Sequence, residues 1–217
     1  MRHGRTAGLR RFTPAAPGPV RSEKILRAHA ISLRAGAPYP AEMIRLLALS
    51  GSLRARSSNA ALLGAAVLLA PDTLRVEAFE GIGDLPHFNP DLESEALPPV
   101  VNAFRRRIGE ADGLLISCPE YARGIPGSFK NALDWLVGSL DFPGKPVALF
   151  NASPRASDAQ AALRLVLATM SARLIAEADL TLPLLAKGLE AHAIAADPVL
   201  ADPIRAALAA FAAAVEP

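Results

Sequence analysis

The residues that could do chemistry gather in two short loops, each directly after an apolar run. The first loop, residues 51–59, holds hydroxyl, amide and guanidinium groups on Ser52, Arg54, Ser57 and Asn59. If a helix starts near Ser57, the free N–H groups of its first turn and its dipole favour an anion. The arginine can neutralise a phosphate. This spacing predicts a phosphate site, although serines that merely cap a helix beside solvated arginines would give the same pattern.

This first loop differs from the common nucleotide-binding loops. It lacks the closing Gly-Lys-Ser/Thr of a P-loop, and it is not the Gly-x-Gly-x-x-Gly of a dinucleotide site. A small phosphomonoester therefore fits the loop better than a triphosphate does.

The second loop, residues 119–127, suits a flat ring. Two prolines and two glycines restrict its backbone, and Tyr121 offers a planar side chain. A rigid loop of this kind can aim N–H and C=O groups at the polar edge of a heterocycle such as a flavin. The amphipathic helix expected after it carries Trp135, the only tryptophan in the sequence.

Five apolar runs, each followed by a helical pattern, would position these loops. The expected strands are residues 44–49, 74–79, 113–117, 146–150 and 174–176, and the expected helices are 57–69, 98–109, 126–137, 156–170 and 198–215. Five such units predict an α/β fold with an open, doubly wound parallel sheet and helices on both faces. Ligands bind such sheets at the carboxyl ends of the strands, where the strand order reverses.

Charge divides the chain into two parts. Residues 1–42 contain eight Lys/Arg and two acidic residues, whereas residues 43–217 contain fifteen and nineteen. We interpret 1–42 as a basic, disordered extension or an upstream start before Met43, with a targeting segment as the alternative. Residues 43–217 are the predicted domain. Because the basic charge lies in the extension, it gives no reason to expect nucleic-acid binding by the domain.

Composition favours a soluble, cytoplasmic protein. No apolar run reaches the roughly 20 residues that a membrane span requires. Cys118 is the only cysteine, which excludes an internal disulfide and a cysteine-built zinc site. We interpret it as a buried, inert thiol at the end of a strand. The four histidines are scattered without metal-ligand spacing, so we expect no metal.

With both loops in order, the sequence resembles the NADPH-dependent FMN reductases, a family that includes the bacterial chromate and quinone reductases. The residues that carry the resemblance are Gly51-Ser52-Leu53-Arg54 with Ser57 and Asn59, then Pro119-Glu120-Tyr121, Pro126-Gly127, Lys130-Asn131 and Asp134-Trp135. It extends from Met43 to the C-terminus. The resemblance implies a flavodoxin-like fold, with a doubly wound five-stranded parallel sheet and helices on both faces.

The resemblance also implies a set of residues that bind FMN. In the family the first loop holds the FMN phosphate, the second lies along the isoalloxazine, and a third follows the fourth strand. The set carried over is Ser52, Arg54, Ser57, Asn59, Pro119, Glu120, Tyr121, Gly124 and Ser153. Ser153 is carried over only weakly, because Pro154-Arg155-Ala156 stands where a Ser/Gly-rich stretch is common.

A second departure from the family lies at Ala122, where many members have asparagine, and it is followed by Arg123. At the rim of a flavin, Arg123 could attract the 2′-phosphate of NADPH or an anionic acceptor. Equally, it could lie in solvent or form an ion pair across a dimer. No catalytic side chain is expected, because a flavin carries the chemistry itself.

By this resemblance the chain is an NAD(P)H-dependent oxidoreductase. Hydride from NADPH (or NADH) would pass through FMN to a small acceptor: a quinone, chromate, an azo compound or free flavin. Two other functions stay open. One is a flavodoxin-type electron carrier that does not oxidise nicotinamide, and the other is a binding or structural protein that has lost the flavin. In the family the helix at 126–137 helps to build a dimer, so we expect a homodimer or homotetramer, without nucleic-acid or membrane partners.

Overall fold

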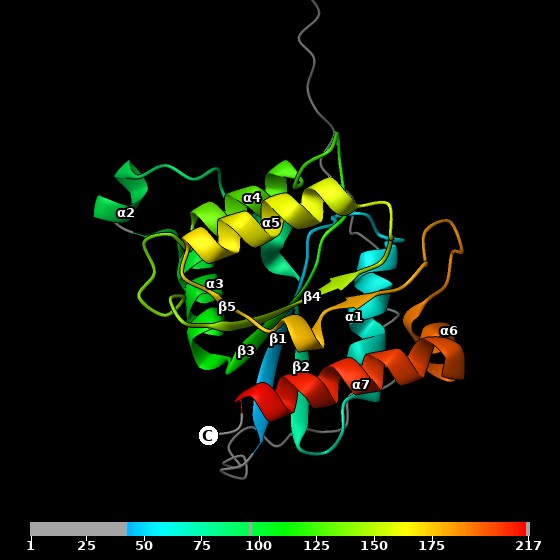
Figure 1. Ribbon diagram of the computed structural model, residues 1–217. Helices are drawn as coiled ribbons and strands as arrows, with labels where there is room; N and C mark the ends of the chain where they lie inside the picture. The colour runs from blue at the N-terminus through cyan, green and yellow to red at the C-terminus, as the bar shows by residue number, and fades with distance from the viewer. Residues whose placement is uncertain (1–42, 96, 216–217) are drawn as a thin grey trace, which may run out of the picture. The chain divides into compact units, whose positions relative to one another are not determined.

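The computed structural model describes residues 43–95 and 97–215 of the chain (Figure 1). The predicted extension, residues 1–42, lies outside the described residues. The described residues therefore belong to the predicted domain.

A parallel sheet with the strand order β2-β1-β3-β4-β5 forms the centre of the domain (Figure 1). The strands are β1 (Ile44–Ser50), β2 (Leu74–Phe79), β3 (Gly113–Ser117), β4 (Pro146–Asn151), β5 (Arg173–Leu174) and β6 (Leu180–Thr181). β1 pairs with β2 on one side and with β3 on the other, so the order in which successive strands join the sheet reverses at β1. The predicted doubly wound, flavodoxin-like sheet is confirmed, and its first four strands match their predicted bounds to within one residue.

The last strand differs from the prediction of one run over residues 174–176. β5 ends at Leu174, a 3-10 turn η2 (Ala176–Ala178) follows, and β6 then pairs with the far end of β4. The Asp179 carboxylate accepts the Leu149 N–H at 2.7 Å, where a continuous strand would offer a backbone carbonyl. The edge of the sheet is thus made of two short pieces, which is a common way to blunt an exposed edge.

Helices cover both faces of the sheet. They are α1 (Ser58–Leu69), α2 (Asp91–Glu95), α3 (Pro99–Glu110), α4 (Gly127–Asp134), α5 (Ser157–Thr169), α6 (Ala191–Ala196) and α7 (Pro198–Val215), with a further 3-10 turn η1 (Gly81–Asp84). The five predicted helices are present. α4 is shorter than predicted, because residues 135–138 continue as turns, and α2, α6 and η1 were not predicted.

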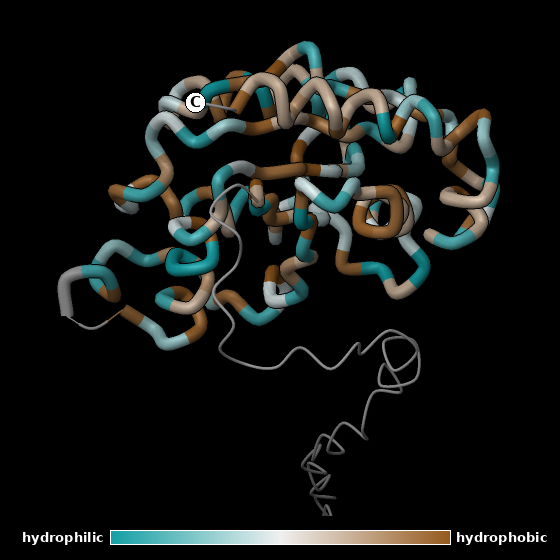
Figure 2. Tube along the Cα trace, turned by 90° about the horizontal axis from the view of Figure 1, so that it is seen from below, coloured by the Kyte–Doolittle hydropathy of each residue, from teal (hydrophilic) through white to brown (hydrophobic). Residues whose placement is uncertain are grey.

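Alternate side chains of the strands pack into two separate cores. Leu46 and Ala48 face the core that lies under α1, α6 and α7, whereas Leu47 and Leu49 face the core under α3, α4 and α5. All five residues of β3 are buried, as a central parallel strand requires. The hydrophobic stretches of the central strands are visible along the tube in Figure 2. This two-sided burial fixes where each strand ends, and hence where the loops begin.

Helix α7 is long and apolar enough, by length and composition alone, to pass for a membrane span. In the fold it packs Ile204, Leu208 and Phe211 into the core over the sheet. Gly113 at the start of β3 makes room for this helix, because a Cβ there would lie 2.5 Å from the ring of Phe211. The apolar side of α7 therefore serves as a cover for the sheet.

Candidate functional site

The loops after β1 and β3 meet at Gly51. Its N–H donates to the Ser117 carbonyl at 2.8 Å. A Cβ at this position would lie 2.8 Å from the Cys118 Sγ and 3.1 Å from its Cα. Only glycine allows so close an approach, so this residue sets the first loop directly against the start of the second.

The first turn of α1 offers unpaired N–H groups at this junction. Ser57 caps the helix, since its Oγ accepts the Ala60 N–H at 3.3 Å. The Asn59 Oδ1 accepts the buried Ser117 hydroxyl at 2.9 Å, which ties α1 to the end of β3. Among the described residues, the N–H groups of Ser58 and Asn59 have no partner. Ser57 and Asn59 thus shape the helix start, and the backbone supplies free donors for an anion.

Two arginines stand free in the same loop. Arg54 and Arg56 are both exposed, and neither forms an ion pair with any residue that the structure describes. Ser52 organises the turn, because its Oγ accepts the Arg54 N–H at 3.4 Å and its own N–H donates to Ser50. Unpaired guanidinium groups beside a helix N-terminus are the donor set that a phosphate ester requires. The residues present therefore fit the phosphate end of FMN.

The second loop forms a tight turn over residues 121–124. The N–H of Tyr121 donates to the Gly124 carbonyl at 3.1 Å, and the N–H of Gly124 donates back at 3.0 Å. Ala122 and Arg123 between them both have positive φ, 49° and 62°. This is the pattern of a two-residue type I′ turn. It leaves Tyr121 about half exposed at the carboxyl edge of the sheet, where a planar ring can contact it.

Glu120, a predicted cofactor ligand, has a partner that sequence reasoning missed. Its Oε2 accepts the N–H groups of Asp158 and Ala159 at 2.9 and 3.0 Å. The N-cap residue of α5, Ala156, has no side chain that could do this. The Glu120 carboxylate thus caps α5 from a loop 38 residues earlier in the chain, which links the loop after β3 to the helix after β4.

Arg123 forms an ion pair with the same first turn of α5. Its Nε donates to the Asp158 Oδ2 at 2.5 Å, while most of the guanidinium stays exposed. The hydrogen bond and the charge of Asp158 raise the pKa of Arg123 above its ordinary value. This ion pair within the chain was not among the alternatives predicted for Arg123.

The third loop, after β4, is closed by its own hydrogen bonds. The Ser153 N–H donates to Asn151 Oδ1 at 3.0 Å, and the Ser153 Oγ accepts the Arg155 N–H at 3.3 Å. Arg155 is exposed and has no ion pair in the described part of the chain. Ser153 lies at the carboxyl edge of the sheet like the other predicted residues, and its hydroxyl retains a proton to donate.

Between the two main loops, Cys118 and Pro119 connect β3 to the turn. Cys118 is fully buried, and this burial raises the pKa of its thiol to about 12. The thiol is therefore protonated at neutral pH, and the predicted buried residue is confirmed. Pro119 is half buried and leads directly into Glu120.

The Asn131 and Trp135 of the second motif hold the loop that follows β2. The Asn131 amide donates to the Pro86 carbonyl at 2.9 Å and accepts the Phe88 N–H at 2.8 Å. The Trp135 indole donates to the same Pro86 carbonyl at 2.7 Å and meets the Phe88 ring edge-on. Trp135 and Leu136 are fully buried. This part of the motif positions the loop that carries His87.

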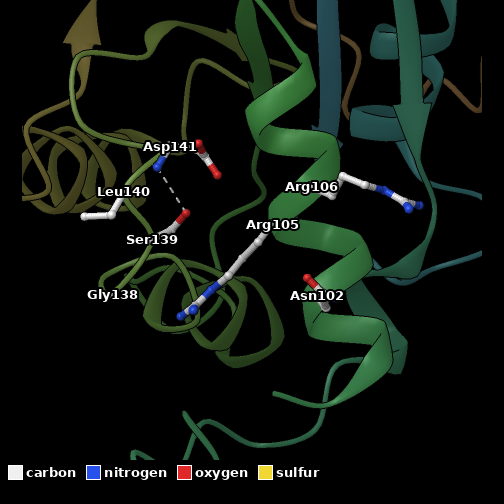
Figure 3. A pocket seen from close by; sticks show the side chains of 7 residues that line it. All are labelled: Asn102, Arg105, Arg106, Gly138, Ser139, Leu140 and Asp141. Atoms are coloured by element: carbon white, nitrogen blue, oxygen red, sulfur yellow. Dashed lines mark hydrogen bonds between the residues drawn. The ribbon is translucent and has the colours of Figure 1, made fainter. Parts of the chain in front are cut away.

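A surface cavity of about 430 Å³ lies apart from these three loops (Figure 3). It is lined by Asn102, Arg105, Arg106, Gly138, Ser139, Leu140 and Asp141. Arg105 is already engaged, because it donates to the Trp135 carbonyl at 2.7 Å and pairs with Glu93. No loop at the carboxyl ends of the strands contributes to this cavity. Within the described ranges, no three His, Cys, Asp or Glu side chains are grouped to hold a metal ion.

The sequence of the described domain matches a known family. Residues 44–186 match the family described as NADPH-dependent FMN reductase. An NAD(P)H-dependent FMN reductase of Pseudomonas aeruginosa is 40% identical over 112 residues, and a quinone reductase of Escherichia coli is 37% identical over 115 residues. These matches cover 51% and 52% of this chain, and only 60% and 61% of the two relatives.

Comparison with solved structures extends the likeness over most of the fold. The flavoenzyme NAD(P)H:(acceptor) oxidoreductase FerB of Paracoccus denitrificans is 30% identical, with a TM-score of 0.65. The match covers 80% of this chain and 97% of FerB. An NADH:FMN oxidoreductase in its apo form has a TM-score of 0.58 at 22% identity, which shows the shared fold alone.

Proposed function

Because the chain belongs to the NADPH-dependent FMN reductase family, we propose that it binds FMN and transfers electrons from NADPH or NADH to a small acceptor. The observation that carries the proposal is the donor set after β1. At the start of α1, Arg54, Arg56 and the N–H groups of Ser58 and Asn59 have no partner among the residues that the structure describes. This point is also where the strand order reverses, which is where such folds bind their ligands.

The residues of this chain would bind and orient the cofactor. Arg54, the Ser52 hydroxyl and the N–H groups of Ser58 and Asn59 would hold the phosphate. Tyr121 and Gly124, in the turn after Pro119, would lie along the ring, with Ser153 at its far side. When bound, FMN supplies the acceptance of hydride and the release of electrons. The protein then contributes position and electrostatics, and no side-chain nucleophile is required.

We propose a quinone as the acceptor. The relatives include proteins named quinone reductase from Escherichia coli and Pseudomonas putida, and a 2-hydroxy-1,4-benzoquinone reductase from a Burkholderia species. A quinone is planar and accepts two electrons, which suits a flat site beside Tyr121. Chromate, azo compounds and free flavin are the competing acceptors, and steady-state rates on these four classes would rank them.

We also propose that the protein works in the cytoplasm as at least a homodimer. Two large apolar side chains stand out from the segment after α4: Val137 is 66% exposed and Leu140 is 96% exposed. If they form one continuous patch, it is the kind of surface that a partner covers. Light scattering on the purified protein would give the number of chains. A Leu140→Glu variant that stays dimeric would place the interface elsewhere.

The test of the function is a visible absorption spectrum of the full chain after incubation with FMN, before and after anaerobic addition of NADPH. We expect flavin to stay with the protein through gel filtration and its absorption near 450 nm to bleach with NADPH, on the order of one equivalent. Bound flavin that stays oxidised would favour the electron carrier. A protein that does not retain FMN would contradict the proposal and leave only the fold.

A further inference from the structure

The turn at residues 121–124 and the first turn of α5 are joined by two separate contacts. Glu120 accepts the N–H groups of Asp158 and Ala159, and the Arg123 guanidinium donates to the Asp158 carboxylate. The turn follows β3, and α5 follows the neighbouring strand β4. Asp158 therefore takes part in both contacts, through its backbone and its side chain, at the carboxyl edge of the sheet.

The turn needs such support because its backbone is strained. Ala122 and Arg123 hold φ values of 49° and 62°, a left-handed region that side chains with a Cβ disfavour. Two-residue turns of this kind normally use asparagine, aspartate or glycine at both positions. Ala-Arg does not favour the conformation, so contacts from outside the turn must maintain it.

The charges around Arg123 argue against a free anion-binding role. Its guanidinium is paired with the Asp158 carboxylate, which raises the pKa of Arg123 through a hydrogen bond and its charge. The Arg123 charge is thus already offset by that of Asp158, which weakens its attraction for a phosphate or an oxyanion. Arg123 is thus better explained as a residue that joins the turn to α5 than as one that binds an anion.

We propose that Asp158 is a positioning residue, whose ion pair with Arg123 holds the 121–124 turn in its left-handed form and thereby fixes Tyr121 beside the flavin. The part that concerns the flavin rests on the proposed function. The part that concerns the turn is a property of the chain alone, and the two parts have separate readouts.

The experiment compares three variants of the full chain with the unchanged protein. Asp158→Asn removes the charge at constant size. Asp202→Asn is the matched control, because Asp202 pairs with Arg205 at 3.0 Å on the exposed side of α7. The third is the double variant Ala122→Asn with Asp158→Asn, since asparagine tolerates positive φ at this position of the turn.

Two measurements are made on each protein. Hydrogen exchange without FMN follows the peptide that contains Tyr121 and Gly124, whose N–H groups close the turn. Quenching of FMN fluorescence gives the dissociation constant for the flavin. Because Asp158 also lies in the first turn of α5, exchange of the α5 peptides is measured in parallel to detect fraying of that helix.

Asp158→Asn is expected to speed exchange in the turn and to raise the FMN dissociation constant about twofold to fivefold, the usual range for one exposed ion pair. Asp202→Asn should change neither quantity. Adding Ala122→Asn should restore both, because the turn then no longer needs the ion pair. If Asp158→Asn acted only by fraying α5, Ala122→Asn would not restore the exchange rate or the FMN dissociation constant.

Three results would overturn the inference. Unchanged exchange in Asp158→Asn would show that the ion pair does not hold the turn. Faster exchange with an unchanged FMN dissociation constant would refute the positioning of Tyr121, as would an equal effect of Asp202→Asn. If the unchanged protein does not bind FMN, the proposed function and the flavin half of the inference both fail, while the exchange rates still decide the role of Asp158 in the turn.

Discussion

At the scale of single residues, the β1–α1 loop separates side chains that shape the site from those that are free to bind. Ser57 and Asn59 are committed to Ala60 and Ser117, whereas the Arg54 guanidinium has no partner in the described part of the chain. The residue types alone did not reveal this division, because serine, asparagine and arginine all bind phosphate well. The structure therefore points to Arg54 as the residue to test.

Replacing Arg54 with glutamine should weaken FMN binding about tenfold, the usual cost of one lost hydrogen bond to a charged group. Riboflavin, which has the same ring and no phosphate, should bind equally well to both proteins. Fluorescence titration with the two flavins measures this directly. Arg205→Gln is the control with the same charge change, because Arg205 lies on α7 in an exposed ion pair with Asp202, and it should leave both affinities unchanged. Equal losses for FMN and riboflavin would place the phosphate elsewhere.

Gly51 gives a second prediction at this scale, because it has no room for a side chain. Gly51→Ala would set a Cβ 3.1 Å from the Cys118 Cα, and a backbone atom does not move aside easily. We expect a loss of about 1–3 kcal/mol in the free energy of unfolding, measured with urea. Gly127→Ala is the control, since nothing lies within 4 Å of a Cβ there. Similar losses at both positions would refute this reading of the contact.

At the scale of elements, a helix or strand could be predicted where residues close together in the sequence determine it. β1 to β4 were predictable because each is an apolar run bounded by turn residues, and α1 because Ser57 marks its start. The break between β5 and β6 was not predictable. It depends on the Asp179 carboxylate reaching β4, a contact between residues 30 positions apart.

The candidate site also combines local features with contacts between distant residues. Its two loops could be predicted from their composition and spacing. The pairing of Glu120 and Arg123 with Asp158 could not, because it joins residues 35 to 39 positions apart whose distance is set only by the order of β3 and β4 in the sheet. Asp158 read alone is an ordinary acidic residue in the first turn of a helix.

The capping of α5 by Glu120 yields a prediction at this scale. Glu120→Ala leaves two N–H groups of α5 without their acceptor, and the free energy of unfolding should fall by about 1 kcal/mol, as for the loss of a helix cap. Urea unfolding measures the loss. Glu110→Ala is the control, because Glu110 is exposed at the end of α3 and makes only a long ion pair with Arg106. An unchanged stability in Glu120→Ala would mean that water replaces the cap.

At the scale of the whole molecule, every element that the structure describes lies at β1 or after it. Both cores are built from residues between Ile44 and Val215, and β1 is the strand on which the sheet reverses its order. A chain that starts at Met43 therefore keeps every element that positions the two loops. It also loses six net positive charges, which belong to residues 1–42.

We predict that the chain starting at Met43 unfolds at the same urea concentration as the full chain and binds FMN with the same affinity. The physical reason is that each described contact of the site joins residues beyond position 43. A chain starting at Gly51 is the control. It lacks β1, whose two ladders are the central pairings of the sheet, and it should not fold. Weaker FMN binding by the Met43 chain than by the full chain at low salt, with a difference that disappears at high salt, would instead assign the basic residues 1–42 a part in attracting the phosphate.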